Sequence, residues 1–343
     1  MSADPITPIA PTTGRGAAAG TMLAAVQDRY GSADVLTVRP VPRPSIKDKD
    51  LLVRVRAASV NYADMVLMTG QPYAARLAFG LSRPKTTIRG RDVAGDVVAV
   101  GAAVSGFAPG DEVYAEIETG SFAEYAAVPA ARAWHKPTTV SFTQAATVPV
   151  AGVTAWQGLR DHGRVQPGQR VLINGASGGV GTFAVQIAKA LGAQVTAVCS
   201  TRNVELVRSL GADDVIDYTR ADFTRTGRRW KLIFDVAGRH RLADCRRALA
   251  PRGTLMLCGG KGGPWLGPMG RIAGATLWSP FIGHRLGGYL AKPDQRSLRE
   301  LTELIEAAVV VPQVERTFPL VRAAEAMRVF VDEHPRSKFV VEM

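Results

Sequence analysis

A glycine-rich segment near the middle of the chain carries the clearest chemical signal. An apolar stretch over Arg170–Asn174 leads into residues 175–181, which read Gly-Ala-Ser-Gly-Gly-Val-Gly, and a stretch of helical spacing follows over 182–191. This is the glycine fingerprint of dinucleotide-binding folds, with alanine in place of the first glycine. In it, Gly178 lets the backbone approach a pyrophosphate and Gly181 lets helix and strand pack closely. The helix N-terminus then faces the phosphates with its free N–H groups. The alternative is a tight strand–helix turn that binds no ligand. We predict that a dinucleotide is bound by Ala176, Ser177, Gly178, Gly179, Val180 and Gly181.

The residues after the next apolar strand, 194–199, indicate which dinucleotide binds. A site for NAD normally has Asp or Glu about 20 residues past the glycines, where the carboxylate binds the ribose 2′-hydroxyl. Here the strand runs into Ser200-Thr201-Arg202-Asn203, which contains no carboxylate. Two hydroxyls followed by arginine suit a 2′-phosphate, because a guanidinium offers a planar set of donors. The sequence therefore favours NADP(H), although Ser200 or Asn203 could instead cap the next helix.

The elements that must position these residues form two halves. Between residues 21 and 140, short β-like runs alternate with turn signals such as Pro109-Gly110-Asp111, which predicts a small barrel or sandwich. After Gln144, strands alternate with helices, which predicts βαβ units on a parallel, doubly wound sheet. The strands expected there are 170–174, 194–199, 215–218, 232–235 and 254–258, with helices over 182–191, 204–210 and 242–249. Residues 264–293 read as a loop with a short helix. The C-terminal part predicts helices over 298–308 and 323–331 and strands over 317–320 and 339–341.

Composition excludes several classes of protein. Apolar residues make up 46% and charged residues 21% of the chain, as in soluble globular proteins. No apolar run approaches the roughly 18 residues of a transmembrane helix. The 42 basic and 30 acidic residues give a net charge of +12, but the basic residues are scattered, so nucleic-acid binding is not expected. Cys199, Cys245 and Cys258 form no C-x-x-C pair, which favours free thiols and a cytoplasmic location. Residues 1–20, rich in Pro, Ala, Thr and Gly, are expected to form a disordered tail and not a secretory signal.

Five stretches together resemble the medium-chain dehydrogenase/reductase superfamily, in its zinc-independent, quinone oxidoreductase-like branch. They are Asn61–Asp64, Gly90–Gly95, Gly120–Tyr125, Val153–Ala155 and Ala176–Gly181. The resemblance implies an α/β protein with a GroES-like, β-rich catalytic domain and a doubly wound Rossmann domain that binds NADP. The catalytic domain would span residues 21–143, completed by 311–343, and the Rossmann domain residues 144–310. A cleft between them would hold the nicotinamide and a small-molecule substrate, and the protein would form a homodimer.

Zinc-dependent relatives differ from this chain at their metal ligands. They carry a His where this chain has Arg91, a Cys near the position of Asn61, and a four-cysteine lobe where residues 102–143 contain no Cys. His135 is the one His in that span and is expected to be structural. We therefore expect no metal. Without Zn²⁺ to polarise an alcohol oxygen, hydride addition to an enone or a quinone is the easier reaction, since the accepting carbon is already polarised.

The resemblance also suggests catalytic residues. Asn61 and Asp64 match residues that lie near the nicotinamide and substrate, and Asn61 could donate an amide hydrogen bond there. Asp64 has a structural alternative, capping a helix that begins near Met65. Tyr73 lies about one residue from the spacing at which similar enoyl-thioester reductases place a proton-donating Tyr, and Tyr62 is its rival.

Further cofactor contacts follow from the same resemblance. Thr154 matches a residue beside the nicotinamide. Gly259 and Gly260 end the fifth strand of the nucleotide domain, at the edge where the nicotinamide would lie. Lys338 lies in a C-terminal stretch that returns to the cleft, but its side chain is expected to be solvated. Ala237 departs from the family, which often has Asn there. The residues expected around the adenosine 2′-phosphate are Ser200, Thr201, Arg202 and Tyr218.

The function expected from these features is NADPH-dependent, zinc-independent transfer of hydride to an enone or quinone. Two alternatives within the enzyme class are reduction of an enoyl-thioester and metal-free carbonyl/alcohol chemistry. A third, of another class, is a nucleotide-binding module with a structural or nucleic-acid role and little turnover.

Overall fold

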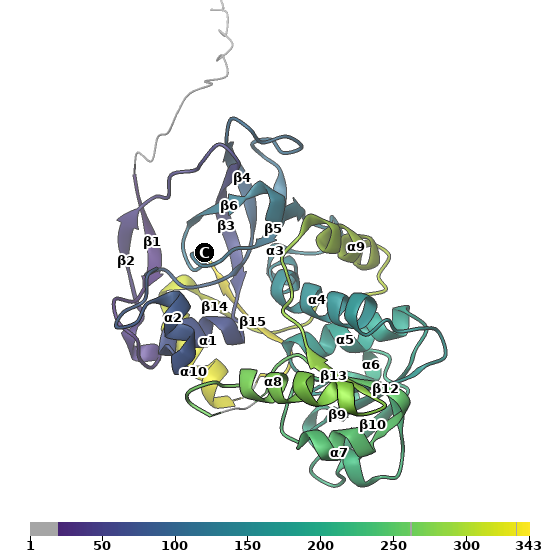
Figure 1. Ribbon diagram of the computed structural model, residues 1–343. Helices are drawn as coiled ribbons and strands as arrows, with labels where there is room; N and C mark the ends of the chain where they lie inside the picture. The colour runs from purple at the N-terminus through teal and green to yellow at the C-terminus, as the bar shows by residue number, and fades with distance from the viewer. Residues whose placement is uncertain (1–19, 261–262, 334) are drawn as a thin grey trace, which may run out of the picture.

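The computed structural model describes residues 20–260, 263–333 and 335–343, and its strands form three sheets (Figure 1). The expected N-terminal tail lies outside the described residues except for Gly20. The strands are β1 (Thr21–Val26), β2 (Thr37–Pro42), β3 (Asp50–Ser59), β4 (Asp92–Val100), β5 (Glu112–Glu116), β6 (Tyr125–Pro129), β7 (Ala133–His135), β8 (Arg170–Asn174), β9 (Gln194–Cys199), β10 (Asp214–Asp217), β11 (Trp230–Asp235), β12 (Leu249–Leu257), β13 (Arg285–Gly288), β14 (Val314–Pro319) and β15 (Lys338–Glu342). The α-helices are α1 (Tyr62–Thr69), α2 (Arg76–Phe79), α3 (Phe142–Ala145), α4 (Val148–Trp156), α5 (Gly179–Ala190), α6 (Val204–Ser209), α7 (Leu242–Arg247), α8 (Met269–Trp278), α9 (Gln295–Glu306) and α10 (Ala323–Glu333).

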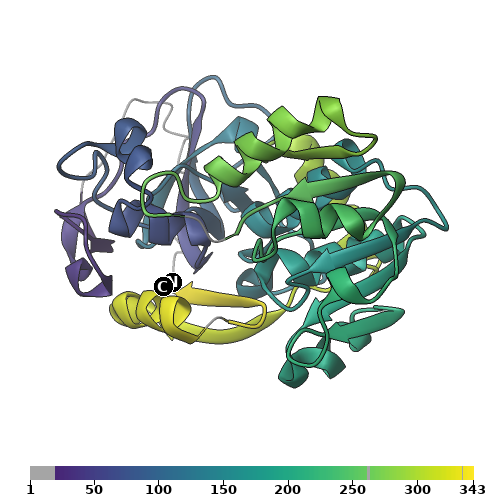
Figure 2. The same cartoon turned by 60° about the horizontal axis from the view of Figure 1, so that its bottom comes forward.

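The N-terminal half is built on a sheet that contains strands from both the N-terminal and the C-terminal parts of the chain. Its order is β14-β15-β3-β4-β5-β7, with β6 paired to β3. The long strand β3 pairs with β4 along most of its length, with β6 over Asp50–Arg54 and with β15 over Ala57–Ser59. Figure 2 shows the C-terminal segment, in yellow, beside the purple and blue N-terminal half. Its core joins β3 residues such as Val53 and Val55 to Phe339 and Val341 of β15.

The second large sheet is parallel throughout, and a layer of helices packs on each of its two faces. Its order, β10-β9-β8-β11-β12-β13, is 3-2-1-4-5-6 in chain order, the doubly wound arrangement predicted from the sequence. Successive residues of β8 enter different cores: Val171 and Ile173 pack with α4, α5 and α9, whereas Leu172 packs with residues of α7 and α8. Both faces are buried, which explains why these strands read as continuous apolar runs.

Residues 264–293 are more ordered than the sequence indicated. They contain the helix α8 and the strand β13, which pairs with β12 and completes the parallel sheet. The sequence of β13, Arg-Leu-Gly-Gly, has little strand propensity of its own, so its pairing depends on the neighbouring strand and on α8. Within the described part of the chain, every helix is too short or too polar to cross a bilayer.

Candidate active site

The glycine turn joins β8 to α5 with the geometry that a dinucleotide site requires. Gly175 has a φ of +87°, a left-handed conformation that favours glycine. A Cβ on Gly181 would lie 2.1 Å from the carbonyl oxygen of Gly175, so the helix can pack this closely only with glycine there. A Cβ on Gly178, in contrast, would have the same oxygen as its nearest neighbour at 3.6 Å. Gly181 thus serves packing, while Gly178 leaves room for a ligand to reach the backbone and the N-terminus of α5. The turn fits a pyrophosphate.

A buried polar cluster, unnoticed in the sequence, lies where the strand order reverses between β8 and β11. The amide of Asn174 donates to Asp235 Oδ1 at 2.8 Å, and the backbone N–H of Gly238 donates to the same oxygen at 2.9 Å. Arg271 from α8 pairs with Asp235 Oδ2 at 2.7 Å. Asp235 is fully buried. These contacts fix the loop after β11 at the crevice where doubly wound folds bind ligands. The available signal was that Asn174 and Asp235 each end an apolar strand.

The loop after β9 is linked directly to the glycine turn. Asn203 is buried, and its amide nitrogen donates to Ser177 Oγ at 2.9 Å and to Ser200 Oγ at 3.2 Å. Neither Ser200 nor Asn203 caps the following helix through its side chain, so that alternative is wrong. The structure therefore brings the predicted residues Ser177 and Ser200 together. Asn203 makes this connection by bridging the two loops, and its side chain does not cap a helix.

The other residues expected around the 2′-phosphate are more exposed. Tyr218 is 52% exposed, and the exposed Arg202 contacts the carbonyl oxygen of Glu333 at 3.4 Å. The Thr201 hydroxyl donates to Asp217 Oδ2 at 2.5 Å. Hydrogen bonds from Thr201 and Thr219 lower the pKa of the Asp217 carboxyl. Because the Thr201 hydroxyl is used in this way, Ser200 and Arg202 are the better placed donors for an anion.

A second buried polar group joins the catalytic half to the glycine turn, and we call it the Lys338 cluster (Ser59, Asn61, Asp92 and Lys338). Lys338 Nζ donates to Asn61 Oδ1 at 2.5 Å and lies 3.3 Å from Asp92 Oδ2. The Asn61 amide nitrogen donates to Asp92 Oδ2 at 2.9 Å and to the Ser59 carbonyl oxygen at 3.2 Å. The Ser59 hydroxyl also donates to Asp92. Both N–H groups of the Asn61 amide are therefore engaged by the protein.

The expectation that Lys338 is solvated is wrong, since its exposed fraction is 3%. The reason is long-range pairing. Strand β15 lies against β3, and the residue before it, Ser337, donates its backbone N–H to the Ser177 carbonyl oxygen at 2.7 Å. A Cβ on Gly179 would lie 2.8 Å from Lys338 Cδ, so the lysine stem packs on the glycine turn. Burial lowers the pKa of Lys338, partly offset by the nearby Asp92 carboxylate.

Asp92 also holds the helix that carries Thr154. The backbone N–H of Val150, in the first turn of α4, donates to Asp92 Oδ1 at 2.8 Å. The carbonyl oxygen of Thr154 accepts the hydroxyl of Tyr289, and burial raises the pKa of that phenol well above its usual value. Gly260, beyond β12, lies against the loop after β11: a Cβ on Gly238 would be 2.4 Å from its Cα. Thr154 and the Gly259-Gly260 segment thus both belong to the crevice side of the parallel sheet.

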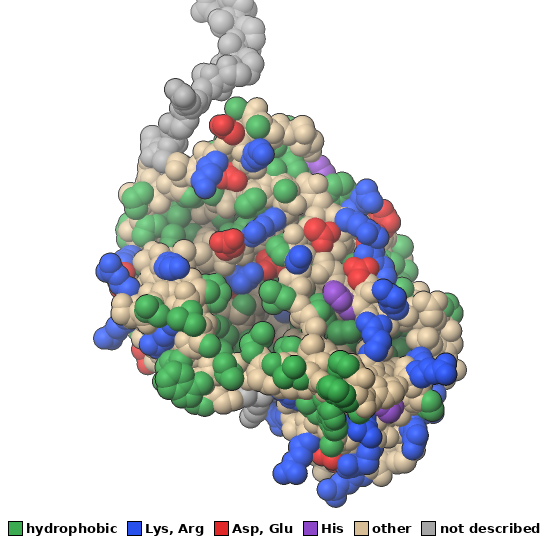
Figure 3. All heavy atoms as spheres, viewed as in Figure 1, with side chains coloured by type: hydrophobic (Ala, Val, Ile, Leu, Met, Phe, Trp, Pro, Cys, Tyr) green, Lys and Arg blue, Asp and Glu red, His purple; other side chains and the backbone are tan. Residues whose placement is uncertain are grey.

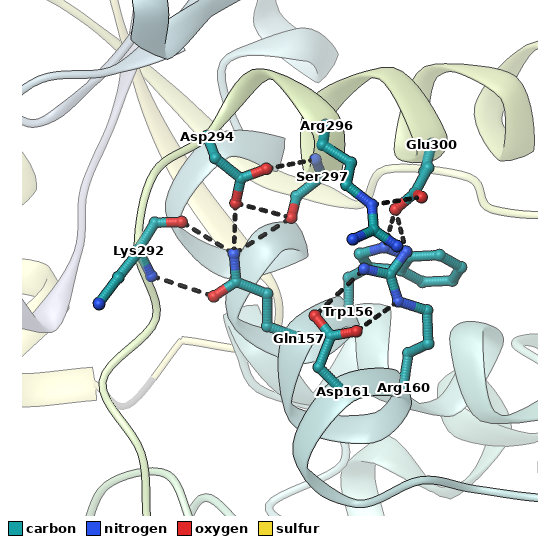
Figure 4. Close-up of polar contacts among 9 residues, drawn as sticks. All are labelled: Trp156, Gln157, Arg160, Asp161, Lys292, Asp294, Arg296, Ser297 and Glu300. Atoms are coloured by element: carbon teal, nitrogen blue, oxygen red, sulfur yellow. Dashed lines mark hydrogen bonds and ion pairs between the residues drawn. The ribbon is translucent and has the colours of Figure 1, made fainter.

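The far end of α4 is fixed to α9 by the contacts drawn in Figure 4. The chain continues from α4 as a π-helical turn over Gln157–His162. The Gln157 amide nitrogen donates to Asp294 Oδ2 at 2.6 Å and to the Lys292 carbonyl oxygen at 2.8 Å (Figure 4). The Trp156 indole donates to Glu300 Oε2 at 2.8 Å, and Arg160 pairs with the same carboxylate. With Asp92 at one end and α9 at the other, α4 has little freedom to move Thr154.

Asp64 has the geometry of its structural alternative. Helix α1 begins at Tyr62, three residues earlier than expected, and Asp64 Oδ2 accepts the backbone N–H of Asn61 at 2.9 Å. This is the third-residue carboxylate of a capping box. Burial raises the pKa of Asp64 to about 6, and the neighbouring Arg91 guanidinium opposes that rise.

The two candidate tyrosines lie in different surroundings. Tyr62 is 51% exposed, and partial burial raises the pKa of its phenol. Tyr73 packs edge-on against Trp265, with ring centroids 5.4 Å apart. The backbone N–H groups of Tyr73 and Ala74 donate to the carbonyl oxygens of Pro264 and Trp265 at 2.7 and 3.0 Å. Tyr73 therefore lies where the loop after α1 meets the segment that follows β12, a contact between the two halves.

The positions compared with zinc ligands have other partners. Arg91 pairs with Glu116 at 2.5 Å. His135 Nε2 lies 3.1 Å from the Gly106 carbonyl oxygen, and its ring stacks on Phe107. Among residues 20–260, 263–333 and 335–343, no group of three or more His, Cys, Asp or Glu side chains is placed to hold a metal ion.

Comparisons with known proteins agree with this architecture. The family model for the alcohol dehydrogenase GroES-like domain matches residues 47–138, and the model for zinc-binding dehydrogenases matches residues 210–341. The mitochondrial NAD(P)H oxidoreductase RTN4IP1 of Homo sapiens is 34% identical over 94% of this chain and 89% of its own length. The chloroplastic NADPH-dependent alkenal/one oxidoreductase of Arabidopsis thaliana is 33% identical over 93% of this chain and 79% of its own.

A solved structure is similar over the whole described fold. The quinone oxidoreductase from Coxiella burnetii, 27% identical, superposes with a TM-score of 0.83 and covers 94% of this chain and 100% of its own. The predicted fold class, a GroES-like β-rich domain with a doubly wound Rossmann domain, is confirmed. The chain is an oxidoreductase with a nicotinamide cofactor and a small-molecule substrate. It belongs to the medium-chain dehydrogenase/reductase superfamily, in the quinone oxidoreductase-like branch.

Proposed function

We propose that this protein uses NADPH, without zinc, to transfer hydride to a conjugated carbonyl compound (an enone) or to a quinone. The observation that carries the proposal is the joining of two loops by Asn203, which places Ser200 beside Ser177 of the glycine turn. The loop that follows β9 offers a hydroxyl and the Arg202 guanidinium, with no carboxylate of its own, to the ribose 2′-position. That donor set suits a phosphate better than a hydroxyl.

The nicotinamide, when bound, supplies the hydride that adds to the polarised carbon of the substrate. The protein's own contribution is to hold the reactants and to place donors where negative charge develops. In this role the glycine turn binds the pyrophosphate, and Thr154 and the Gly259-Gly260 segment line the crevice beside it. Asn61 has a positioning role and does not donate to the substrate, since both of its amide N–H groups already bond to Asp92 and Ser59. The Lys338 cluster holds the catalytic half, which forms one wall of the cleft, next to the glycine turn.

We propose Tyr73 as the proton donor to the enolate, because its loop lies at the contact between the two halves. Tyr62 is the alternative. Replacing Tyr73 with Phe removes the hydroxyl and keeps the ring against Trp265, so kcat should fall by about 100-fold while the KM for NADPH stays unchanged. Tyr62→Phe is the matched control and should retain activity. Full activity of Tyr73→Phe would exclude it as the donor, and loss of activity only in Tyr62→Phe would assign the proton to Tyr62.

Steady-state oxidation of NADPH tests the function directly. The panel is 1,4-naphthoquinone, an α,β-unsaturated ketone, crotonyl-CoA and a saturated aldehyde, each with NADPH and with NADH. Turnover of the quinone or the enone, with a lower KM for NADPH, supports the proposal. Preference for crotonyl-CoA would assign an enoyl-thioester reductase, and preference for the aldehyde would assign carbonyl chemistry. Tight binding of NADPH with no turnover of any substrate would assign a nucleotide-binding module.

Several further parts of the proposal rest on the sequence. The absence of a resident metal follows from Arg91 and from the cysteine-free stretch 102–143, and elemental analysis of the purified protein tests it. The domain limits 21–143 with 311–343, and 144–310, and the homodimer follow from the family resemblance. The cytoplasmic location rests on the free thiols, and the relatives compared above are mitochondrial or chloroplastic.

A further inference from the structure

A basic concavity lies on the nucleotide-binding half, outside the crevice described above. It has a volume of about 480 Å³, within the range of small-molecule sites. We call it the arginine pocket, defined by Arg229, Arg246, Arg247, Arg252 and His284 among its lining residues. Leu249 and Pro251 supply apolar wall. Figure 3 shows Lys and Arg side chains gathered at the lower right of the molecule, where Figure 1 places α7.

The arginine pocket lies at the opposite edge of the parallel sheet from the glycine turn. Arg229 directly precedes β11, His284 directly precedes β13, and Arg252 lies in the first half of β12. All strands of this sheet are parallel, so their amino ends share one edge, and the glycine turn follows the carboxyl end of β8. At about 3.3 Å per residue, β11 alone separates the two edges by about 16 Å. A ligand in the pocket is therefore not the dinucleotide.

Most of the positive charge in the pocket is not neutralised by the protein. Arg247 pairs with Asp244 at 2.5 Å. Within the described residues, Arg229, Arg246 and Arg252 have no ion pair. The Arg246 guanidinium lies 5.3 Å from the ring centre of Trp278, so an aromatic face orients it. Arg246 and Arg247 end α7, and cations are favoured at a helix C-terminus. The helix C-terminus does not explain Arg229 or Arg252, because these residues belong to other elements.

His284 shows the effect of this charge on a neighbour. Burial lowers the pKa of its imidazole, and repulsion from Arg246 and Arg229 lowers it further, partly offset by a backbone hydrogen bond with Ala250. His284 Nδ1 is buried and has no hydrogen-bond partner in the described part of the chain. The three guanidinium groups without counter-charges among the described residues, those of Arg229, Arg246 and Arg252, leave the pocket with unused hydrogen-bond donor capacity. An anion would use that capacity and reduce the repulsion.

We propose that the arginine pocket is a binding site for a small molecule that carries two linked phosphate groups. Each guanidinium group can donate two parallel hydrogen bonds to a phosphate. The pocket has several such groups from different elements, so a single phosphate would leave some of these donors unused. The volume is too small for a folded nucleic acid but sufficient for a nucleoside diphosphate or for inorganic pyrophosphate. Leu249 and Pro251 offer apolar contacts that a nucleoside would use and pyrophosphate would not.

Isothermal titration calorimetry on the NADPH-saturated protein tests this site without interference from the cofactor crevice. Inorganic pyrophosphate and ADP should bind with one site per chain, and orthophosphate at least tenfold more weakly. A higher affinity for ADP than for pyrophosphate would identify a nucleotide as the ligand, and equal affinities would identify the diphosphate itself. Both results support the site. At a ligand concentration 100-fold above Kd, the Tm should rise by about 4 °C or more.

A charge-matched pair of variants separates the pocket from the overall charge of the protein. The triple variant Arg229→Gln, Arg246→Gln, Arg252→Gln should weaken binding at least tenfold. The control triple Arg83→Gln, Arg299→Gln, Arg322→Gln removes three exposed arginines elsewhere and should change it less than twofold. Equal losses in both variants, or binding that disappears when NADPH is saturating, would overturn the proposal. So would tight binding of a single-stranded oligonucleotide through the pocket with no binding of pyrophosphate.

Discussion

The nicotinamide end and the adenosine end of the proposed cofactor crevice differ in how far their polar groups are already bound to the protein. At the nicotinamide end, Asn61 and Lys338 are 5% and 3% exposed, and they bond to each other and to the buried Asp92. At the adenosine end, Tyr218 is 52% exposed and the exposed Arg202 contacts a backbone carbonyl. The first region is a packed interior that borders the proposed nicotinamide site. The second is a surface loop that carries suitable donors.

This difference suggests a division of tasks. Groups that are buried and fully hydrogen-bonded hold one geometry, and altering any of them costs stability as well as activity. Exposed donors contribute to binding only when the ligand is present, so altering them should change selectivity and leave the fold intact. Stability effects should therefore be largest at the Lys338 cluster and smallest along the loop after β9, whereas cofactor preference should follow the opposite order.

The Lys338 cluster provides the strongest test. Lys338→Met keeps an unbranched stem against Gly179 but removes the ammonium group from the buried Asp92 carboxylate. Breaking a buried ion pair on one side costs about 3–5 kcal/mol, because the remaining charge loses its compensation. We expect a loss of that size in the free energy of unfolding measured with urea, together with a lower kcat.

Lys136→Met is the matched control, since Lys136 is also a buried lysine but pairs with the exposed Glu112, away from the glycine turn. It should lower stability less and leave the Kd for NADPH unchanged. If Lys338→Met lowered the free energy of unfolding by less than 1 kcal/mol, the cluster would not be what holds the two halves together.

The glycine turn separates packing from ligand contact within four residues. In Gly181→Ala the new Cβ would meet a backbone oxygen at 2.1 Å, so the helix must shift from β8, at a cost of about 2–3 kcal/mol in stability. In Gly178→Ala the nearest atom is at 3.6 Å, so the fold should tolerate the methyl group. The second variant should instead weaken NADPH binding, which fluorescence titration measures. If both variants lowered the Tm equally, the distinct roles of these glycines would be refuted.

How much of this could be read from the sequence depended on whether the deciding contacts were local. The bounds of β8 and β9 were predicted as found, because strands buried on both faces read as uninterrupted apolar runs. Strand β13 was missed, because its two glycines carry no strand signal and Gly288 is held by packing: a Cβ there would lie 2.9 Å from Ile272 of α8.

The site shows the same limit. The glycine turn was predictable because strand, turn and helix are contiguous. Lys338 was misjudged because its burial depends on β15 meeting β3 and the glycine turn, partners that are distant in sequence. Asp92 was quoted only as part of a family motif, and its bonds to Asn61 and Val150 appear only in the folded chain. Arg271 reaches Asp235 from a segment whose helix was itself uncertain in the sequence.

At the adenosine end, Arg202→Ala should change selectivity without unfolding the protein. Loss of a charge-assisted hydrogen bond to the 2′-phosphate should weaken NADPH relative to NADH by roughly 1–3 kcal/mol. The ratio of kcat/KM for the two cofactors measures this, with the Tm as the readout of stability. Arg208→Ala, which removes an exposed arginine paired with Glu205 on α6, is the control. An unchanged cofactor ratio in Arg202→Ala would place the phosphate elsewhere.

The smallest effect is expected from the pH dependence of Asp64, a buried carboxyl at the nicotinamide end. Burial raises its pKa from 3.8 to about 6 in the folded protein. Between these two values the folded state binds the proton and the unfolded state does not, so stability falls as the pH rises through this range. The contribution is fully present at low pH and is lost above pH 6. Between pH 5 and pH 7 it amounts to about 1.3 kcal/mol.

Asp64→Asn tests this contribution because an amide oxygen can still accept the backbone N–H of Asn61. The variant should lose this part of the pH dependence, so its stability relative to the wild type should increase from pH 5 to pH 7 in urea titrations. Its kcat should stay within a few-fold of wild type if Asp64 acts by capping α1. A large loss of kcat at unchanged stability would instead make Asp64 a catalytic residue, and it would show that the buried end of the crevice also contributes directly to the chemistry.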